Sequence, residues 1–437
     1  MKDVPIAGPR AQSGQALVWG MLLLGAMALA FVAYFSVSQM VAVKVRHTHA
    51  LDAAAYSGAV VQARAMNTAA YINRAHIANQ VAMAHLATLS SWAALGEAQA
   101  RQLFSGNPPM HVIGMLFGAD HAAAYSAARR AVGLGAMQPQ LAAAYMAHDA
   151  TVRQVLARAQ ASIVETLPAV RRHVIETVLE ANFEASPDRT FRLEFDTDEW
   201  PDAVSLLSGP RHLAPVVRAA ASRYGFLAPR HHTAYNNWVV SPMCPGLRHQ
   251  LRRRGTTQMD DQGRWQSVDT LSYHALRSNQ WIGCYYREYP MGWGWLAGAT
   301  GHVLDDPHTD APPDDFSEVD FWRWVRDSTD WDIAAGSANP LANSRAHVTR
   351  RLWDTGGLPG FHDVGESASN GRIAFALSLH RTADTDRVVT TRSAAETFFA
   401  RPAGREDGRL EHANLFRPYW QARLVAHPHA SFLEERK

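Results

Sequence analysis

Residues 16–35 form an apolar run without a charged side chain, and this run constrains the fold more than any other feature. A helix crosses a bilayer with about 20 apolar residues. A cleaved signal peptide is the alternative, but its apolar core is only about 7–15 residues long and ends at small residues. The run here is longer, and Ser36–Gln39 is a weak cleavage site. We therefore expect a short N-terminal segment over 1–15 and a retained transmembrane helix over 16–38.

The charges that flank this run do not decide its orientation. Lys2 and Arg10 precede it, while Lys44 and Arg46 follow it, so the positive-inside comparison is a tie. The segment before the run is short and the bulk of the chain follows it. We therefore expect the N-terminus to be cytoplasmic and the rest of the chain to lie on the other side of the membrane.

The overall charge balance limits the classes of partner. The chain has 437 residues, with 42 Lys and Arg against 40 Asp and Glu. A nucleic-acid partner would require a clustered basic face, which this near-neutral balance disfavours. The length is typical of two or three domains. Most of the 13 Trp residues follow residue 199, which indicates a large core or an apolar surface in the second half.

An Ala-rich region over 39–189 follows the apolar run. Residues 37–104 contain no Pro, and Ala, the best helix former, is the commonest residue there. Ser105–Pro109 is a strong helix breaker. A second helical pattern covers about 120–183, with an expected break at Gln138-Pro139 and a kink at Pro168. We interpret the region as two antiparallel helical blocks that form a hairpin stalk.

Small side chains on the first block would let a second helix approach closely. We expect these positions to pack against a partner helix: Ala53, Ala54, Ala55, Gly58, Ala69 and Ala70.

The composition changes after Ser186-Pro187, where Ala becomes rarer and Trp, Pro, Gly and His increase. Four runs have β-forming composition: Thr190–Phe195, Trp238–Ser241, Ile282–Tyr289 and Arg372–His380. We expect helix near Ser393–Phe399 and His412–Leu424. The region 190–437 is therefore predicted to be an α+β head with a mainly antiparallel sheet, which makes the whole chain α+β.

Two cysteines, Cys244 and Cys284, are a candidate disulfide. Two such thiols would pair in an oxidising compartment, where the predicted orientation places them. The alternative is a pair of separate buried thiols.

The chain contains no sequence signature of catalysis. It has no nucleophile elbow, Walker motif or HExxH motif, and no paired acid and base. The spacing of His231-His232 and of His302 and His308 matches no compact zinc pattern. We therefore predict no catalytic, cofactor-binding or metal-binding residues and no enzyme activity.

Three further patterns have structural interpretations. The acidic segment Leu304–Ser317 is typical of a solvated loop. The basic run Leu251–Arg254 is typical of a solvated face or of a contact with an acidic partner. Gly292–Gly298 lacks the order of a phosphate-binding loop, and its alternating Gly and Trp indicate a tight hairpin with aromatic packing.

Several segments resemble TadG-like proteins of the Flp/Tad pilus-assembly system. Arg10 with Gly14–Val18 resembles the family's RGQALV segment, and Asp52–Ala59 resembles its DAAAYSAA segment. The other segments that resemble one branch of this family are Tyr71–Ala75, Ala78–Ala82, Phe398–Pro402 and Asn414–Leu424. The resemblance covers about residues 10–92 and 394–424, and it adds Asn73, Arg74 and Asn79 to the predicted partner-helix positions.

The resemblance implies a single-pass protein of the bacterial inner membrane with a periplasmic domain. It also implies a structural role in pilus assembly, with TadE- and TadF-like pseudopilins as partners and no cofactor. Prepilin-like substrates carry Glu five residues after the processing-site Gly, whereas this chain carries Trp19 there. This difference fits TadG-like members and argues against processing.

Two other functions remain open on the sequence alone. The first is an envelope-anchored binding module whose Trp-rich head recognises a glycan or a secreted ligand. The second is a periplasmic hydrolase, which would require a buried His–carboxylate pair beside a Ser in a cleft.

Overall fold

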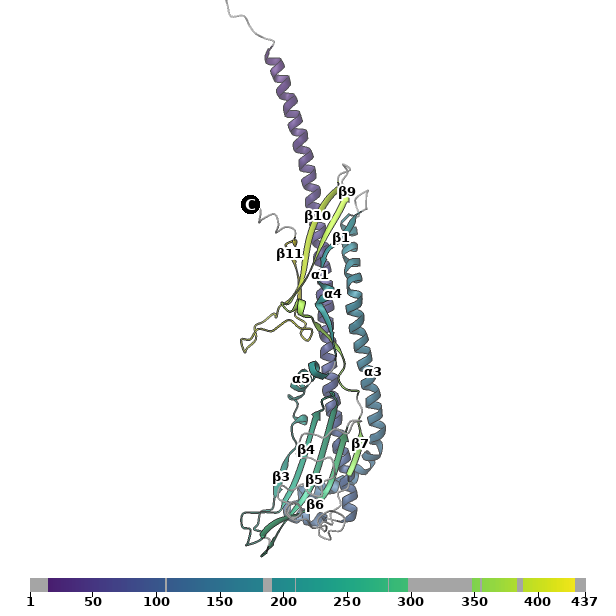
Figure 1. Ribbon diagram of the computed structural model, residues 1–437, viewed down its shortest axis with the longest axis vertical. Coiled ribbons are helices and arrows are strands. Elements are labelled where there is room, and N and C mark those ends of the chain that lie inside the picture. Colours follow the sequence, from purple (N-terminus) through teal and green to yellow (C-terminus); the bar gives the residue numbers. More distant parts are fainter. Residues whose placement is uncertain are drawn as a thin grey trace, which may run out of the picture. The chain divides into compact units, whose positions relative to one another are not determined.

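The computed structural model describes residues 15–106, 108–183, 191–208, 210–281, 283–297, 348–353, 356–382 and 388–428 (Figure 1). The chain is α+β, with a long apolar N-terminal helix and mainly antiparallel sheets. It divides into two compact units. Unit 1 comprises residues 1–68, 164–204 and 364–437, and unit 2 comprises 69–163 and 205–363. Each unit takes in part of the helical region 39–189 and part of the region 190–437.

Three helices account for most of the first 183 residues. Helix α1 covers Gln15–Ser105, α2 covers Met110–Phe117 and α3 covers Ala119–Phe183. The Pro-free, Ala-rich sequence explains the length of α1. The shorter helices are α4 (Trp200–Ala203), α5 (Pro210–Ala221) and the 3₁₀ turns η1 (Gly225–Leu227) and η3 (Glu366–Ala368).

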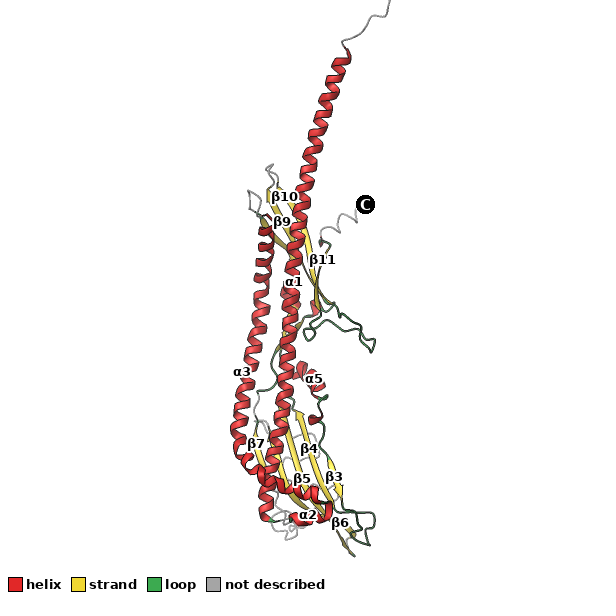
Figure 2. Cartoon of the chain, turned by 180° about the vertical axis from the view of Figure 1, so that it is seen from behind, coloured by secondary structure: helices red, strands yellow, loops and turns green. Residues whose placement is uncertain are grey.

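Unit 1 contains a four-stranded antiparallel sheet in the order β1-β9-β10-β11. Its strands are β1 (Arg192–Asp198), β9 (Arg372–Thr382), β10 (Val388–Phe399) and β11 (Trp420–Val425). The core of the unit joins α1, α3 and this sheet, with buried members such as Leu51, Ile175 and Phe375. The sheet and both helices are visible side by side in Figures 1 and 2.

Among its described residues, unit 2 contains a five-stranded sheet in the order β3-β4-β5-β6-β7, in which only the β6–β7 pair is parallel. Its strands are β3 (His232–Tyr235), β4 (Gln250–Met259), β5 (Trp265–Asn279), β6 (Gly283–Ala297) and β7 (Val348–Leu352). Residues of α1, α2 and α3 pack against β4, β5 and β6, around Ile113, Tyr125 and Met291 (Figure 2). Strands β2 (Val204–Leu207) and β8 (Phe361–Val364) form a separate two-stranded sheet.

Several local predictions are wrong. Helix α3 continues through Gln138-Pro139, and Trp238–Ser241 is not a strand. The helices expected at 393–399 and 412–424 are absent, because 393–399 belongs to β10 and 420–424 belongs to β11. Strand β10 is paired on both sides, with β9 and with β11, so its ladder hydrogen bonds outweigh the helix propensity of Ala394 and Ala395. The predicted loop at 304–317 lies outside the described residues.

The glycines of β6 also differ from the sequence interpretation. Gly292 and Gly294 do not form a tight hairpin; they lie inside a 15-residue strand. A Cβ atom on Gly294 would overlap the backbone oxygen of Ser91 and the backbone nitrogen of Leu95 in α1. The absence of a side chain at this position is therefore what allows the helix and the strand to approach so closely.

Candidate functional site

The first part of α1 presents an apolar surface that nothing in the described chain covers. Its apolar side chains are exposed, as at Leu22 (60%), Leu29 (74%) and Phe31 (66%). Within the described residues, α1 is the one helix that is long and apolar enough to cross a membrane, with a mean hydropathy of 2.1 over its most apolar window. This surface is consistent with single-pass anchoring near the N-terminus, because lipid would cover side chains that water disfavours.

Helix α1 continues without a break from this apolar segment into a packed core. Burial begins at His47, and Ala50 and Leu51 are 2% and 0% exposed. Because no loop separates the two parts, the position and rotation of the apolar segment are set by the helix that carries the core residues.

The predicted packing positions of unit 1 contact other elements of the same chain. Ala54, Ala55 and Gly58 are buried, whereas Ala53 is exposed. A Cβ atom added at Gly58 would lie 2.8 Å from Cδ1 of Ile175 in α3 and 3.2 Å from Cζ of Phe375 in β9. The small residues therefore allow close packing with α3 and the sheet, and Ala53 remains on the surface.

In unit 2, the predicted small residues are again buried. Ala69 and Ala70 are 2% and 0% exposed. Arg74 is exposed, and its guanidinium carbon lies 5.9 Å from the centre of the Tyr71 ring. Arg74 and Ala53 are thus the predicted positions that stay accessible on α1.

The two predicted asparagines are held by hydrogen bonds within unit 2. The Asn73 side chain donates to the carbonyl of His362 at 2.8 Å and accepts from Nε2 of Gln160 at 2.7 Å. The Asn79 side chain donates to Oδ1 of Asp149 at 2.6 Å. These amides tie α1 to α3 and to β8, a role that small-residue spacing alone does not predict.

Cys244 and Cys284 form a disulfide, with their Cα atoms 6.1 Å apart. Cys284 is near the start of β6, and Cys244 lies in the loop before β4. Leu276 and Tyr286 pack around the bridge, which links this loop to the sheet of unit 2.

Unit 1 contains a His, a carboxylate and a Ser in contact, but their order is not that of a hydrolase. The carboxylate of Asp196 accepts from the Ser378 hydroxyl at 2.6 Å and contacts Nε2 of His427 at 2.9 Å. In a catalytic triad the His lies between the Ser and the carboxylate, so that it removes the hydroxyl proton. Here the carboxylate lies between the other two groups, an arrangement that links β1, β9 and the C-terminal segment.

Within the described residues, no group of three His, Cys, Asp or Glu side chains is arranged to hold a metal ion. Nδ1 of His231 instead accepts from the Gly255 backbone N–H at 3.4 Å, while His302 and His308 lie outside the described residues.

A buried polar cluster joins α1 to the sheet of unit 2. Arg230 donates to both carboxylate oxygens of Asp269, at 2.8 and 2.9 Å, and the Ser91 hydroxyl donates to the same carboxylate. Asp269 is 0% exposed, and burial raises its pKa against the opposing effect of Arg230. Hydroxyl contacts of 2.8 Å extend the cluster from Ser91 to Ser267 and on to Thr257.

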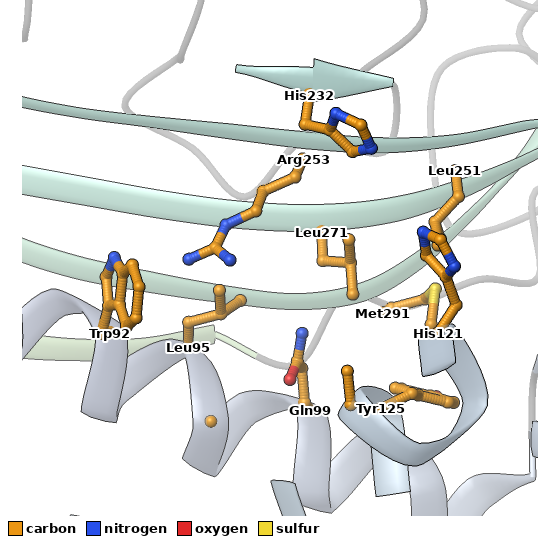
Figure 3. Close-up of a pocket in the computed structure, with 12 residues that line it drawn as sticks. Trp92, Leu95, Gln99, His121, Tyr125, His232, Leu251, Arg253, Leu271 and Met291 are labelled. Atoms are coloured by element: carbon orange, nitrogen blue, oxygen red, sulfur yellow. The ribbon is translucent and has the colours of Figure 1, made fainter. Parts of the chain in front are cut away.

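Next to this cluster, unit 2 contains a partly open cavity of about 350 Å³ between the helices and the sheet (Figure 3). Helices α1 and α3 contribute Trp92, Leu95, Gly96, Gln99, His121, Ala124 and Tyr125, and the strands contribute His232, Leu251, Arg253, Leu271 and Met291. The Arg253 side chain points from β4 toward α1, and its guanidinium carbon lies 4.5 Å from the centre of the Trp92 ring.

The basic run Leu251–Arg254 does not form the solvated face that the sequence suggests. Arg252 is only 7% exposed, and Arg253 and Arg254 are half-buried in β4. Arg252 donates to Oε1 of Gln250 at 2.7 Å, and Arg254 donates to the His232 carbonyl at 3.1 Å. The basic run is the one feature of the sequence that points to this site, but it does not predict that Arg253 contacts Trp92.

No protein-family model, curated protein or solved structure matches the chain.

Proposed function

We propose that this chain is a membrane-anchored, non-enzymatic structural component of a Tad-type (Flp) pilus or a related secretion apparatus. The observation that supports it best is the continuity of α1 from an exposed apolar segment into a packed core. In this proposal the apolar segment spans the bacterial inner membrane once, with the N-terminus inside. The remainder lies in the periplasm, where the Cys244–Cys284 disulfide would be stable.

The proposed stalk is an antiparallel hairpin of α1 and α3. Within unit 2, Asn73 contacts Gln160 and Asn79 contacts Asp149, so residue numbers increase along α1 as they decrease along α3. The TadG-like segments of the sequence fall largely on α1 and on β10 and β11. They therefore coincide with the anchor and with part of the sheet that packs on it.

The proposed partners are inner-membrane lipid and TadE- or TadF-like pseudopilins. The buried residues of α1 pack against α3 and the sheets of the same chain. A partner helix would therefore contact the exposed residues of α1 instead. Ala53 and Arg74 are the predicted positions that fit this requirement.

Photo-crosslinking in the native host tests this contact. A photoreactive amino acid would replace Ala53 or Arg74, with Glu180, an exposed residue of α3, as the matched control position. We expect mass spectrometry to identify TadE- or TadF-like proteins in the products from positions 53 and 74 but not from position 180. Recovery of no pilus-assembly protein from either test position would contradict the proposal.

Membrane fractionation tests the anchor separately. Alkaline carbonate should leave the full-length chain in the membrane pellet, and a membrane-impermeant maleimide should label a Glu180→Cys variant in cells with a permeabilised outer membrane. Mature protein cleaved after Ser38 and recovered in soluble extracts would contradict a retained anchor.

A second function, an envelope-anchored binding module, is favoured by the cavity of unit 2. Among the described Trp residues of the second half, Trp265, Trp293 and Trp353 are buried in the core, whereas Trp238 and Trp281 are exposed. Ligand recognition would use the partly open cavity beside Trp92 and Arg253.

A further inference from the structure

The cavity of unit 2 combines aliphatic and aromatic walls with one guanidinium, from Arg253, and two imidazoles, from His121 and His232. Leu95, Leu251, Leu271 and Met291 provide aliphatic surface, and Trp92 provides an aromatic ring. Figure 3 shows the amide of Gln99 pointing from α1 toward the strands. Small-molecule sites are typically apolar spaces of roughly 300–1,000 Å³ with a few polar groups that orient the ligand, and this cavity has that character.

The charges around the cavity do not balance. Arg253 is 4.0 Å from Oδ1 of Asp269, but that carboxylate already accepts two hydrogen bonds from Arg230 and one from Ser91. Two guanidinium groups therefore share one carboxylate. None of the described residues that line the cavity is Asp or Glu, so the guanidinium of Arg253 faces the cavity without a carboxylate of its own.

Two buried polar atoms at the cavity have no hydrogen-bond partner among the described residues. One is Nε of Arg253 and the other is the hydroxyl of Tyr125, a residue that is 2% exposed. A buried polar group without a partner costs about 1–3 kcal/mol, so this side of the cavity is short of hydrogen-bond acceptors within the described residues. Burial lowers the pKa of Arg253, which reflects the same lack of solvation for its charge.

We propose that this cavity binds a small amphiphilic carboxylate. The carboxylate pairs with the guanidinium of Arg253, and the apolar body lies between Leu95, Leu271 and Met291. A carboxylate fits because a guanidinium offers it parallel N–H donors. An apolar body fits because Leu95, Leu251, Leu271 and Met291 line much of the remaining wall. This inference goes beyond the proposed assembly role and does not depend on it.

Binding of 2-naphthoate to the full-length chain in lipid nanodiscs tests the proposal. Its neutral isostere 2-naphthamide is the matched ligand, and empty nanodiscs correct for partition into lipid. Titration calorimetry should show one site for 2-naphthoate and at least about tenfold weaker binding of the amide, which is the loss expected for one charge-assisted hydrogen bond. Absence of 2-naphthoate binding at millimolar concentration, or equal binding of the two compounds, would overturn the proposal.

Two pairs of variants locate the site. Arg253→Gln should weaken 2-naphthoate binding by about tenfold or more, and Arg253→Lys by less, because Lys keeps the charge but not the fork of donors. Ala124 lines the cavity from an exposed position on α3, so Ala124→Trp should obstruct it without disturbing the core. Ala123→Trp, one residue away and also exposed, should bind normally. Unchanged affinity in Ala124→Trp would refute the location even if Arg253→Gln failed to fold.

Discussion

The side chain of Asn67 in α1 exchanges two hydrogen bonds with the backbone of Trp420. Its Nδ2 donates to the Trp420 carbonyl at 2.9 Å, and its Oδ1 accepts from the Trp420 N–H at 3.0 Å. Trp420 begins β11, which lies at the edge of the sheet of unit 1. The amide therefore replaces the neighbouring strand that this edge lacks, and it fixes β11 to the long helix.

Replacement of Asn67 should loosen β11. Asn67→Ala removes both hydrogen bonds and leaves two part-buried backbone groups unpaired, at a cost of about 2 kcal/mol. Hydrogen exchange of the amides of residues 420–425 measures this cost as a lower free energy of local opening. Thr68→Ala is the control, because Thr68 is exposed and its hydroxyl bonds to Arg64 within the same helix. Equal protection in the Asn67 variant and in wild type would show that the pairing does not stabilise β11.

Gly294 should tolerate no side chain. In Gly294→Ala the added methyl group would overlap backbone atoms of Ser91 and Leu95, and no rotamer change relieves a clash with backbone. We expect unit 2 to lose its packed structure. Trypsin should then cleave rapidly at Arg residues within 205–363, and the yield of purified protein should be low. Gly246→Ala is the control, since the space around Gly246 is open. Normal protease resistance of Gly294→Ala would contradict the close approach of β6 to α1.

The sequence was informative about the long helices because their signals are local. The apolar run and the Pro-free, Ala-rich stretch predict α1, and the pattern over 120–183 matches α3 closely. Local signals failed where tertiary pairing decides the structure. Residues 393–399 have helix-forming composition, yet they form the strand between β9 and β11.

The cavity could not be predicted because its residues come from distant parts of the chain. Trp92 and Arg253 meet only when α1 packs on β4. Three adjacent arginines indicate a solvated face or a contact with an acidic partner, since Arg side chains are mostly exposed. The contacts that they make in the structure include a glutamine side chain, an indole ring and a backbone carbonyl, none of which leaves a recognisable spacing in the sequence.

Loss of the disulfide should destabilise unit 2. The bridge spans a sequence separation of 40 residues, and a closed loop of that size stabilises the native state by about 4 kcal/mol in the chain-entropy model. Cys284→Ser should therefore unfold at a lower urea concentration than wild type. Dithiothreitol should lower the wild-type midpoint and leave that of the variant unchanged. Maleimide labelling of both thiols in unreduced, denatured protein from the native host would contradict both the bridge and the periplasmic location.

His76 should make unit 2 sensitive to acid. The side chain is 1% exposed, and both ring nitrogens lack a hydrogen-bond partner within the described residues. Burial, with a smaller effect of Arg153, lowers the pKa of His76 from 6.5 to about 4. The unfolded chain therefore binds a proton near pH 6.5 while the folded chain does not. His76 therefore has no proton-linked effect on stability above pH 6.5, and it destabilises the folded state as the pH falls toward 4, by up to about 3 kcal/mol.

His76→Leu removes this sensitivity. The variant should be more stable than wild type at pH 7 by about 1 kcal/mol, since an unpaired buried polar group is replaced by a carbon side chain. Its urea midpoint should also fall less between pH 6.5 and 4. Burial raises the pKa of the neighbouring Asp149, which favours the folded state as the pH falls, so the difference between variant and wild type isolates the histidine. His173→Leu, at an exposed position in unit 1, should keep the wild-type slope. A His76→Leu variant that loses stability as steeply as wild type over this range would show that another group controls the acid response.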